Sequence, residues 1–243
     1  MKHSQRMLRL VVMAMMIALG VVISPIIRVE GMCPMAHFIN ILCAVLLGPV
    51  ESLICAVIIG ILRMALMGIP PLALTGAIFG AFLSGVLYRF SKGSLFMAVL
   101  GEIVGTGIIG AIASYPVMTL LWGKEGLSWL FYVPSFVCGT LIGGSLAFAF
   151  LRKLVTSGML TKLQAKFGSP VYNSETGMIG SAVSIASIGV ICFVVIELAG
   201  GSFGWNMQIV SYIAKGMLIL FPTVAVLYLG VKIIGAKHKN SAQ

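Results

Sequence analysis

Long apolar runs, separated by short segments that hold most of the basic residues, constrain this chain more than any other feature. The sequence is 60% hydrophobic and only 9% charged, with a mean hydropathy of +1.12. A soluble globular protein averages about 25% charged residues. A transmembrane helix needs about 20 consecutive, mostly apolar residues, and such runs recur along the whole chain. We therefore expect an all-α integral membrane protein that crosses the bilayer many times.

The apolar runs predict eight membrane-spanning helices. The second is short and ends at Gly48-Pro49. The prolines at 70 and 71 predict a turn after the third helix, because proline removes a backbone donor and favours extended backbone before it. The predicted spans are residues 8–27, 34–47, 52–67, the run from the prolines to residue 88, 95–121, the run from Trp129 to residue 150, 178–199 and 207–234.

Two other segments complete this organisation. Residues 28–32 form a predicted loop on the outer side. Residues 159–167 place lysines between apolar residues, a pattern that suits a short helix lying on the inner membrane surface. We expect a six-helix membrane domain over residues 1–168 and two additional transmembrane helices of unknown role over residues 169–243.

The positions of the basic residues predict the orientation of the chain. Cytoplasmic loops of membrane proteins carry an excess of Lys and Arg. Four of the 16 Lys and Arg residues fall at predicted outer or intramembrane positions: Arg28, Arg63, Lys124 and Lys215. The other twelve lie in the N-terminal tail, in 88–94, in 152–166 and after residue 230. We expect a multi-pass protein of the cell membrane with both termini cytoplasmic, and we take the net charge of +10 as a sign of topology, not of nucleic-acid binding.

Two polar residues, His37 and Asn40, interrupt the short second run. Residues three apart lie on one face of a helix, so their side chains are expected to project together. Polar groups at membrane depth are costly and usually face a cavity or a partner. Either both residues bond to neighbouring helices, or they belong to a ligand pocket with its mouth at Pro34.

Ionisable residues also occur inside the predicted spans. Counting about 1.5 Å per residue from the inner side places Glu102 about 10 Å deep and Arg63 about 16 Å deep. We predict an Arg63–Glu102 ion pair, which either fixes helix packing or serves a ligand. Glu197 and Lys215, near the outer ends of the last two spans, are expected to pair or to extend toward the interface.

A set of aromatic and polar residues is predicted in the outer half of the first six helices. Such a set suits a small, flat, nearly neutral heterocycle better than an ion, a sugar or a nucleotide. Trp129 belongs to this set but fits an interfacial aromatic belt better. The candidate substrate-binding residues are His37, Asn40, Arg63, Thr75, Glu102, Tyr115 and Tyr132.

Sequence motifs of enzymes and cofactor sites do not point to chemistry in this chain. Residues 105–110 match G-x-G-x-x-G, but they lie inside a predicted span, where glycines allow close helix packing. The chain has no Asp, no H-E-x-x-H, no G-x-S-x-G and no Walker motif, and its five cysteines show no metal-binding spacing. We predict that it is not an enzyme and holds neither a cofactor nor a metal.

Several segments together resemble the ThiW family, the substrate-binding (S) components of energy-coupling factor (ECF) transporters. They are the basic N-terminus followed by Ala14-xxx-Ala18, PMAHFINILCAVLLGP in the second run, IGILRMALMG around Arg63, GAIFGAFLSGVLYR in the fourth run and LGEIVGTGIIGAIASYPV from residue 100 to 117. The resemblance covers about residues 8–153, and the second-run and fifth-run segments are its most specific parts.

The resemblance implies a six-helix bundle that binds a thiamine precursor, hydroxyethylthiazole, in a pocket toward the outer face. It also implies docking, through Ala14 and Ala18, on a transmembrane coupling protein driven by two ATPase subunits. The last two spans depart from the six-helix pattern. The alternatives are an S component for another small vitamin or heterocycle, or a self-sufficient channel or secondary transporter, for which inverted repeats and an ionisable relay are expected.

Overall fold

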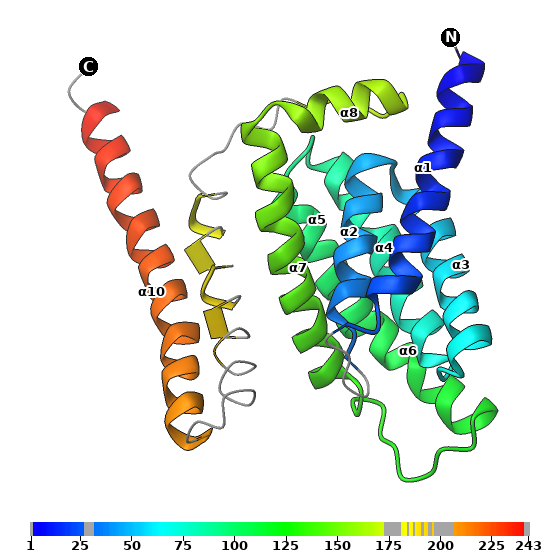
Figure 1. Cartoon of the computed structure of the whole chain (residues 1–243). Coiled ribbons are helices and arrows are strands. Elements are labelled where there is room, and N and C mark those ends of the chain that lie inside the picture. The colour runs from blue at the N-terminus through cyan, green and yellow to red at the C-terminus, as the bar shows by residue number, and fades with distance from the viewer. Residues whose placement is uncertain are drawn as a thin grey trace. The chain divides into compact units, whose positions relative to one another are not determined.

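The computed structural model describes residues 2–26, 32–172 and 207–240, together with most of residues 181–196 (Figure 1). The chain divides into two compact units, Met1–Ser174 and Glu175–Gln243. Regular structure in the described residues is helical, which confirms the predicted all-α class. The first unit contains α1 (Lys2–Ile23), α2 (Pro34–Leu46), α3 (Pro49–Met67), α4 (Leu72–Phe90), α5 (Leu95–Glu102), η1 (Ile103–Gly110), α6 (Ala111–Pro116), η2 (Val117–Leu121), α7 (Val133–Thr156) and α8 (Met159–Phe167).

Six helices of the described chain are long and apolar enough to cross a membrane. They are Ser4–Ile23, Pro49–Met67, Leu72–Phe90, Leu95–Leu121, Val133–Thr156 and Gln208–Ile234, and they match six of the predicted spans. The second predicted span is the shorter apolar helix α2. Residues 28–31 of the predicted loop, much of the predicted span at 178–199 and Glu197 lie outside the described residues.

Helix α2 lies at the centre of the first unit, where α1, α3, α4, α5, α7 and α8 all contact it (Figure 1). Eleven of its thirteen residues are buried, as expected of a helix that is apolar all round. At about 1.5 Å per residue, α2 is about 20 Å long, whereas the hydrocarbon core of a bilayer is about 30 Å thick. Each end of α2 therefore leaves space within the bundle.

The C-terminal end of α2 is closed by polar side chains from distant parts of the chain. The last carbonyls of a helix have no partner within it. Gln164 of α8 donates to the carbonyl of Val45 at 2.9 Å, and Ser169 donates to that of Leu46 at 2.8 Å. The carbonyl of Leu47 accepts from Arg9 of α1 at 2.8 Å and from Arg89 of α4 at 3.3 Å. These bonds join α1, α4 and α8 to the central helix.

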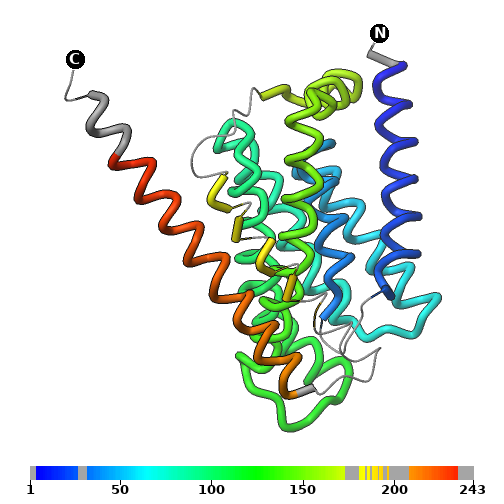
Figure 2. The backbone as a smooth tube through the Cα atoms, turned by 60° about the vertical axis from the view of Figure 1, so that its left-hand side comes forward, coloured from blue at the N-terminus to red at the C-terminus, as the bar shows by residue number. Residues whose placement is uncertain are grey.

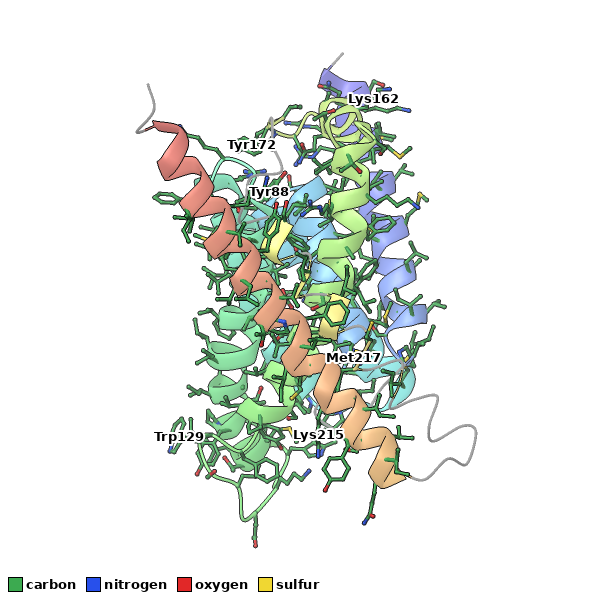
Figure 3. The ribbon with its side chains drawn as sticks, turned by 90° about the vertical axis from the view of Figure 1, so that its left-hand side faces the viewer. Tyr88, Trp129, Lys162, Tyr172, Lys215 and Met217 are labelled. Atoms are coloured by element: carbon green, nitrogen blue, oxygen red, sulfur yellow. The ribbon has the colours of Figure 1, made fainter. Side chains whose placement is uncertain are left out.

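Helix α8 thus covers one end of the bundle, as the backbone view also shows (Figure 2). Its Leu160, Gln164 and Phe167 are buried, while Lys162 is exposed. Tyr88 and Tyr172 form an edge-to-face pair at this same end, and Trp129 lies at the opposite end of the bundle (Figure 3). The helix predicted at 159–167 is confirmed, and its buried residues pack on the bundle.

Close glycine contacts join α4 to the helix formed by α5 and η1. Small residues recur every four positions on α4, at Gly76, Gly80 and Ser84. A Cβ atom built on Gly105 would come within 2.6 Å of the Cα of Gly80, and one on Gly110 within 2.7 Å of the Gly76 carbonyl oxygen. The G-x-G-x-x-G match is therefore a helix-packing surface. Gly105 and Gly110 are five positions apart, whereas the residues of α4 that they contact, Gly80 and Gly76, are four positions apart. The backbone of η1 is π-helical, with hydrogen bonds from i to i+5, and this accommodates the extra residue.

Helix α1 presents two different faces. Met13, Met16, Ile17 and Val21 pack against the core formed by Ile39, Cys43, Cys55 and Ile59. Ala14 and Ala18 are exposed, to one side of this packing face. The two alanines therefore do not pack inside the bundle, and a larger side chain at either position would not disturb its core.

The second unit contains α10 (Met207–Asn240) and short helical pieces within residues 181–196. Helix α10 has 34 residues and contains Pro222. A Cβ atom on Gly189 would come within 2.5 Å of the Cβ of Phe221, so the two helical segments of this unit approach closely there. Lys215 is exposed.

The glycine contact between η1 and α4 gives a stability prediction. Gly105→Ala places a methyl group against the backbone of Gly80, and overpacking of this kind costs about 1–3 kcal/mol. We expect a lower melting temperature of the purified protein in detergent. Gly216→Ala on α10 is the matched control, because a Cβ atom there meets nothing within 4 Å. Equal melting temperatures for the two variants would contradict the packing role of Gly105.

Candidate functional site

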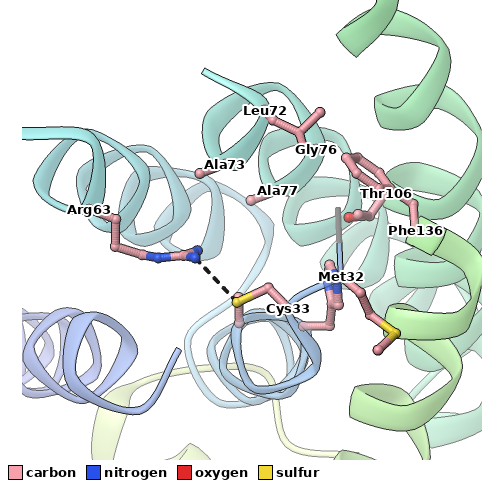
Figure 4. Close-up of a pocket in the computed structure, with 11 residues that line it drawn as sticks. Met32, Cys33, Arg63, Leu72, Ala73, Gly76, Ala77, Thr106 and Phe136 are labelled. Atoms are coloured by element: carbon pink, nitrogen blue, oxygen red, sulfur yellow. Dashed lines mark hydrogen bonds between the residues drawn. The ribbon is translucent and has the colours of Figure 1, made fainter. Parts of the chain in front are cut away.

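A pocket lies beyond the N-terminal end of α2, opposite the end that α8 covers. Its empty volume is about 480 Å³, part of which is open to the surroundings. The ends of α2 and α3 and the start of α4 form its walls, and η1 and α7 each contribute one side chain (Figure 4). The lining residues are Met32, Cys33, Ala36, His37, Arg63, Leu72, Ala73, Gly76, Ala77, Thr106 and Phe136.

Beneath the pocket, three side chains converge on one oxygen of Glu102. Nδ1 of His37 lies 2.9 Å from Oε1, Nδ2 of Asn40 donates to it at 3.1 Å, and Oγ1 of Thr106 donates at 3.0 Å. Glu102 is fully buried. Nδ1 of His37 is engaged by the carboxyl group, which leaves Nε2 for a second partner. The network fixes the orientation of the two lining residues that belong to it, His37 and Thr106.

Helical spacing explains how the sequence builds this network. His37 and Asn40 are three apart on α2 and reach the same carboxylate, as predicted from their shared face. Thr106 follows Glu102 by four residues and also reaches it. The backbone becomes π-helical directly after Glu102, at Ile103. Short π-helical segments occur often at functional sites.

Two glycines of α4 leave room for the site. A Cβ atom on Gly80 would collide with the Thr106 hydroxyl and would lie 2.8 Å from Oε2 of Glu102. A Cβ atom on Gly76 would come within 2.7 Å of the ring of Phe136, which lines the pocket. Glycine at both positions lets α4 approach closely while the carboxylate and the aromatic ring keep their places.

Arg63 lines the pocket but does not form the predicted ion pair with Glu102. It is 3% exposed, and its Nη2 donates to Sγ of Cys33 at 3.2 Å (Figure 4). Glu102 pairs with His37 instead. Arg63 and Glu102 were predicted to pair from their depths along their helices. Depth does not determine the direction in which a helix projects its side chains. The Arg63–Glu102 prediction was wrong for that reason.

The structure places the three other candidate residues outside the pocket lining. Thr75 shares a hydrogen bond of 2.6 Å with the hydroxyl of Ser114. Tyr115 stacks with Trp129, with ring centroids 4.5 Å apart. Tyr132 is buried, and its ring centroid lies 5.9 Å from that of Phe136. Tyr132 therefore supports a lining residue, whereas the other two make separate contacts.

Several lining residues carried no signal in the sequence. Phe136 is one apolar residue among many, and Met32 and Cys33 precede α2, the helix that carries His37 and Asn40. Only Thr106, four residues from Glu102, was open to detection by helical spacing. Within the part of the chain that the structure describes, no group of three or more His, Cys, Asp or Glu side chains is placed to hold a metal ion.

The helices and their apolar surfaces define a class: this is a multi-pass α-helical membrane protein. A family model described as thiamine-precursor transporter protein (ThiW) matches residues 10–157, which is more than half of the chain. The chain therefore belongs to the ThiW family of thiamine-precursor transporters. The matched region includes every lining residue of the pocket. No curated protein and no solved structure matches the chain.

The network beneath the pocket predicts that the effects of substitutions at Glu102 and Thr106 on stability are coupled. Glu102→Ala removes the shared acceptor of three donors, and each buried donor left without a partner costs about 1–3 kcal/mol. Thr106→Val removes one donor only. Because the two residues bond to each other, we expect the double variant to lose less stability than the sum of the single losses. Thermal unfolding of the four proteins in detergent measures this difference, and strictly additive losses would show that the contact contributes nothing.

Proposed function

We propose that this protein is the substrate-binding subunit of an ECF-type transporter and takes up hydroxyethylthiazole, a thiamine precursor. The observation that carries the proposal is the pocket with its buried polar floor, in a chain of the thiamine-precursor transporter family. Of the ligand-binding residues predicted from the sequence, we propose His37 and Arg63 for direct contact, with Glu102 and Asn40 holding His37 in place. Thr75, Tyr115 and Tyr132 lie outside the pocket lining.

The chemistry of the pocket supports a small heterocycle. Ligand pockets typically combine apolar walls with a few polar groups. Here Phe136 and Leu72 offer apolar surface for a flat ring, and His37 and Thr106 offer polar contacts near the floor. A thiazole with one hydroxyl-bearing arm has this combination of an apolar ring and a polar end.

The exposed face of α1 supports docking on a coupling protein. Small residues at a spacing of four allow a partner helix to approach the backbone closely. Ala14 and Ala18 have this spacing and are exposed, so they are available to a partner in the membrane. We propose a transmembrane coupling protein with two ATPase subunits as that partner. The role of the unit that contains α10 stays outside this proposal.

The charges of the first unit support a topology in the cell membrane. Arg9, Arg89 and Lys162 lie at the end of the bundle that α8 covers. By the positive-inside rule, this end is cytoplasmic and the pocket is toward the outer side. We propose the same cytoplasmic side for both termini. A ligand would then enter from outside and meet a closed inner end.

Ligand binding can be measured as thermal stabilisation. A ligand that binds only the folded state stabilises it by RT ln(1 + [L]/Kd), which is about 2.7 kcal/mol at 100 times Kd. We expect hydroxyethylthiazole to raise the melting temperature in detergent. Thiamine, which is larger and cationic, is expected to raise it much less at the same concentration. Equal shifts with both compounds, or none with either, would contradict the proposed substrate.

Docking can be separated from binding with two variants of α1. Ala14→Leu and Ala18→Leu add bulk to the exposed face, so we expect unchanged ligand affinity but loss of uptake and of co-purification with the coupling protein. Ala65→Leu is the matched control, because Ala65 is an exposed alanine of α3. Wild-type uptake in cells that lack every coupling protein would instead favour a self-sufficient transporter.

A further inference from the structure

The guanidinium of Arg63 is buried in the wall of the pocket with little to bind. Its Nη2 donates to the thiol of Cys33, and its Nε has no hydrogen-bond partner. Sulfur is a weak acceptor, whereas a guanidinium has five N–H donors and stays charged in proteins. Among the described residues, Arg63 forms no ion pair. A strong cationic donor thus faces the pocket without an acceptor of matching strength.

A buried charge of this kind is costly unless something compensates it. Charged side chains at membrane depth almost always pair or line a site for a ligand. The buried carboxylate beneath the pocket, Glu102, accepts from His37, Asn40 and Thr106 at Oε1, while its Oε2 has no hydrogen-bond partner among the described residues. It is not among the residues that line the pocket, so it does not neutralise Arg63 by direct contact. The described part of the chain supplies no strong acceptor to Arg63, and a ligand in the pocket would supply one.

The two sides of the pocket also differ in what they offer to a charged ligand. Arg63 lies in the wall with Cys33, near the end of α3. The carboxylate lies beneath His37 and Thr106, which cover it from the pocket. A cationic ligand would therefore meet the guanidinium directly and the carboxylate only through other side chains. An anionic ligand, or a neutral ligand with an exposed acceptor, would bind the guanidinium directly and would be separated from the carboxylate by other side chains.

We infer that Arg63 determines the charge class of the ligand: the site takes heterocycles whose polar arm ends in a hydrogen-bond acceptor, neutral or anionic, and excludes those whose arm ends in a cation. The acceptor binds the guanidinium, and the ring occupies the apolar part near Phe136 and Leu72. This inference rests on the proposed function and deepens it, because it assigns an orientation to the ligand and a reason for excluding positively charged relatives.

The test uses three thiazoles that differ only in the end of the side arm: the hydroxyethyl compound, its carboxylate analogue and its primary amine analogue. For the wild-type protein we expect the carboxylate to bind at least as tightly as the alcohol, and the amine about 10- to 100-fold more weakly than the alcohol. That range is typical of one hydrogen bond to a charged group. Equal affinities for the amine and the alcohol would overturn the inference.

Variants at position 63 show whether the guanidinium is responsible. Arg63→Gln should weaken binding of the carboxylate analogue about 10- to 100-fold and reduce the difference in affinity between the amine analogue and the alcohol. Arg63→Lys keeps the charge but not the planar fork, so it should retain the order of the three compounds with smaller differences. Lys92→Gln, at an exposed position outside the pocket, removes one charge as a control and should change none of the affinities. An equal loss for all three compounds in Arg63→Gln would overturn the inference.

Two further arms separate this inference from the proposed substrate. The same three end groups on a pyrimidine ring test the charge preference without the thiazole. If the pyrimidines follow the expected order and the thiazoles do not bind, the proposed substrate is wrong and the role of Arg63 stands. If no compound of either series binds, both are contradicted. Glu30→Gln removes the carboxylate nearest in sequence to Cys33 and should leave the order of the three compounds unchanged. A charge preference that is absent in the wild type and appears only in this variant would show that Glu30 neutralises Arg63, and would contradict the inference.

Discussion

The structure of the first unit depends on a central helix that is too short to cross a membrane. Helix α2 is buried on all sides but is about 20 Å long, so each of its ends leaves space within the bundle. At one end, α8 and the side chains of Arg9, Arg89 and Ser169 fill that space and bind the free carbonyls. At the other end, the space is the pocket. The short length of α2 thus explains why the bundle is closed at one end and has a pocket at the other.

The carboxylate of Glu102 links this architecture to the candidate site. It accepts from two residues of α2 and from one of η1, and it lies where glycines bring α4 close. The packing of three helices and the orientation of His37 therefore depend on the same buried group. Three donors to Oε1 rigidify the floor, while Oε2 of the same carboxylate has no hydrogen-bond partner among the described residues. Arg63, in contrast, is held by a single weak acceptor, and this difference makes it the residue whose interactions a ligand would change most.

The sequence predicted the helices well because apolar runs and basic clusters are local signals. It also predicted that His37 and Asn40 act together, since helical spacing alone determines that they share a face. It failed for Arg63 and Glu102, because their contact depends on how two helices rotate against each other. The π-helical segment had a weak signal in the glycine spacing: Gly105 and Gly110 are five positions apart, whereas Gly76 and Gly80 of α4 are four positions apart. Phe136 and Cys33 reach the site only through the packing of α7 and α2, which no local pattern records.

The most direct test of the account is whether a ligand occupies this pocket. Cys33 lines it and is partly exposed, so a protein with Cys33 as its only cysteine reports occupancy through the rate of alkylation by a small thiol reagent. A protein with only Cys138, which is exposed on α7, is the control. The account predicts that saturating hydroxyethylthiazole slows labelling of Cys33 and leaves that of Cys138 unchanged. Bound ligand with an unchanged labelling rate at Cys33 would place the binding site elsewhere.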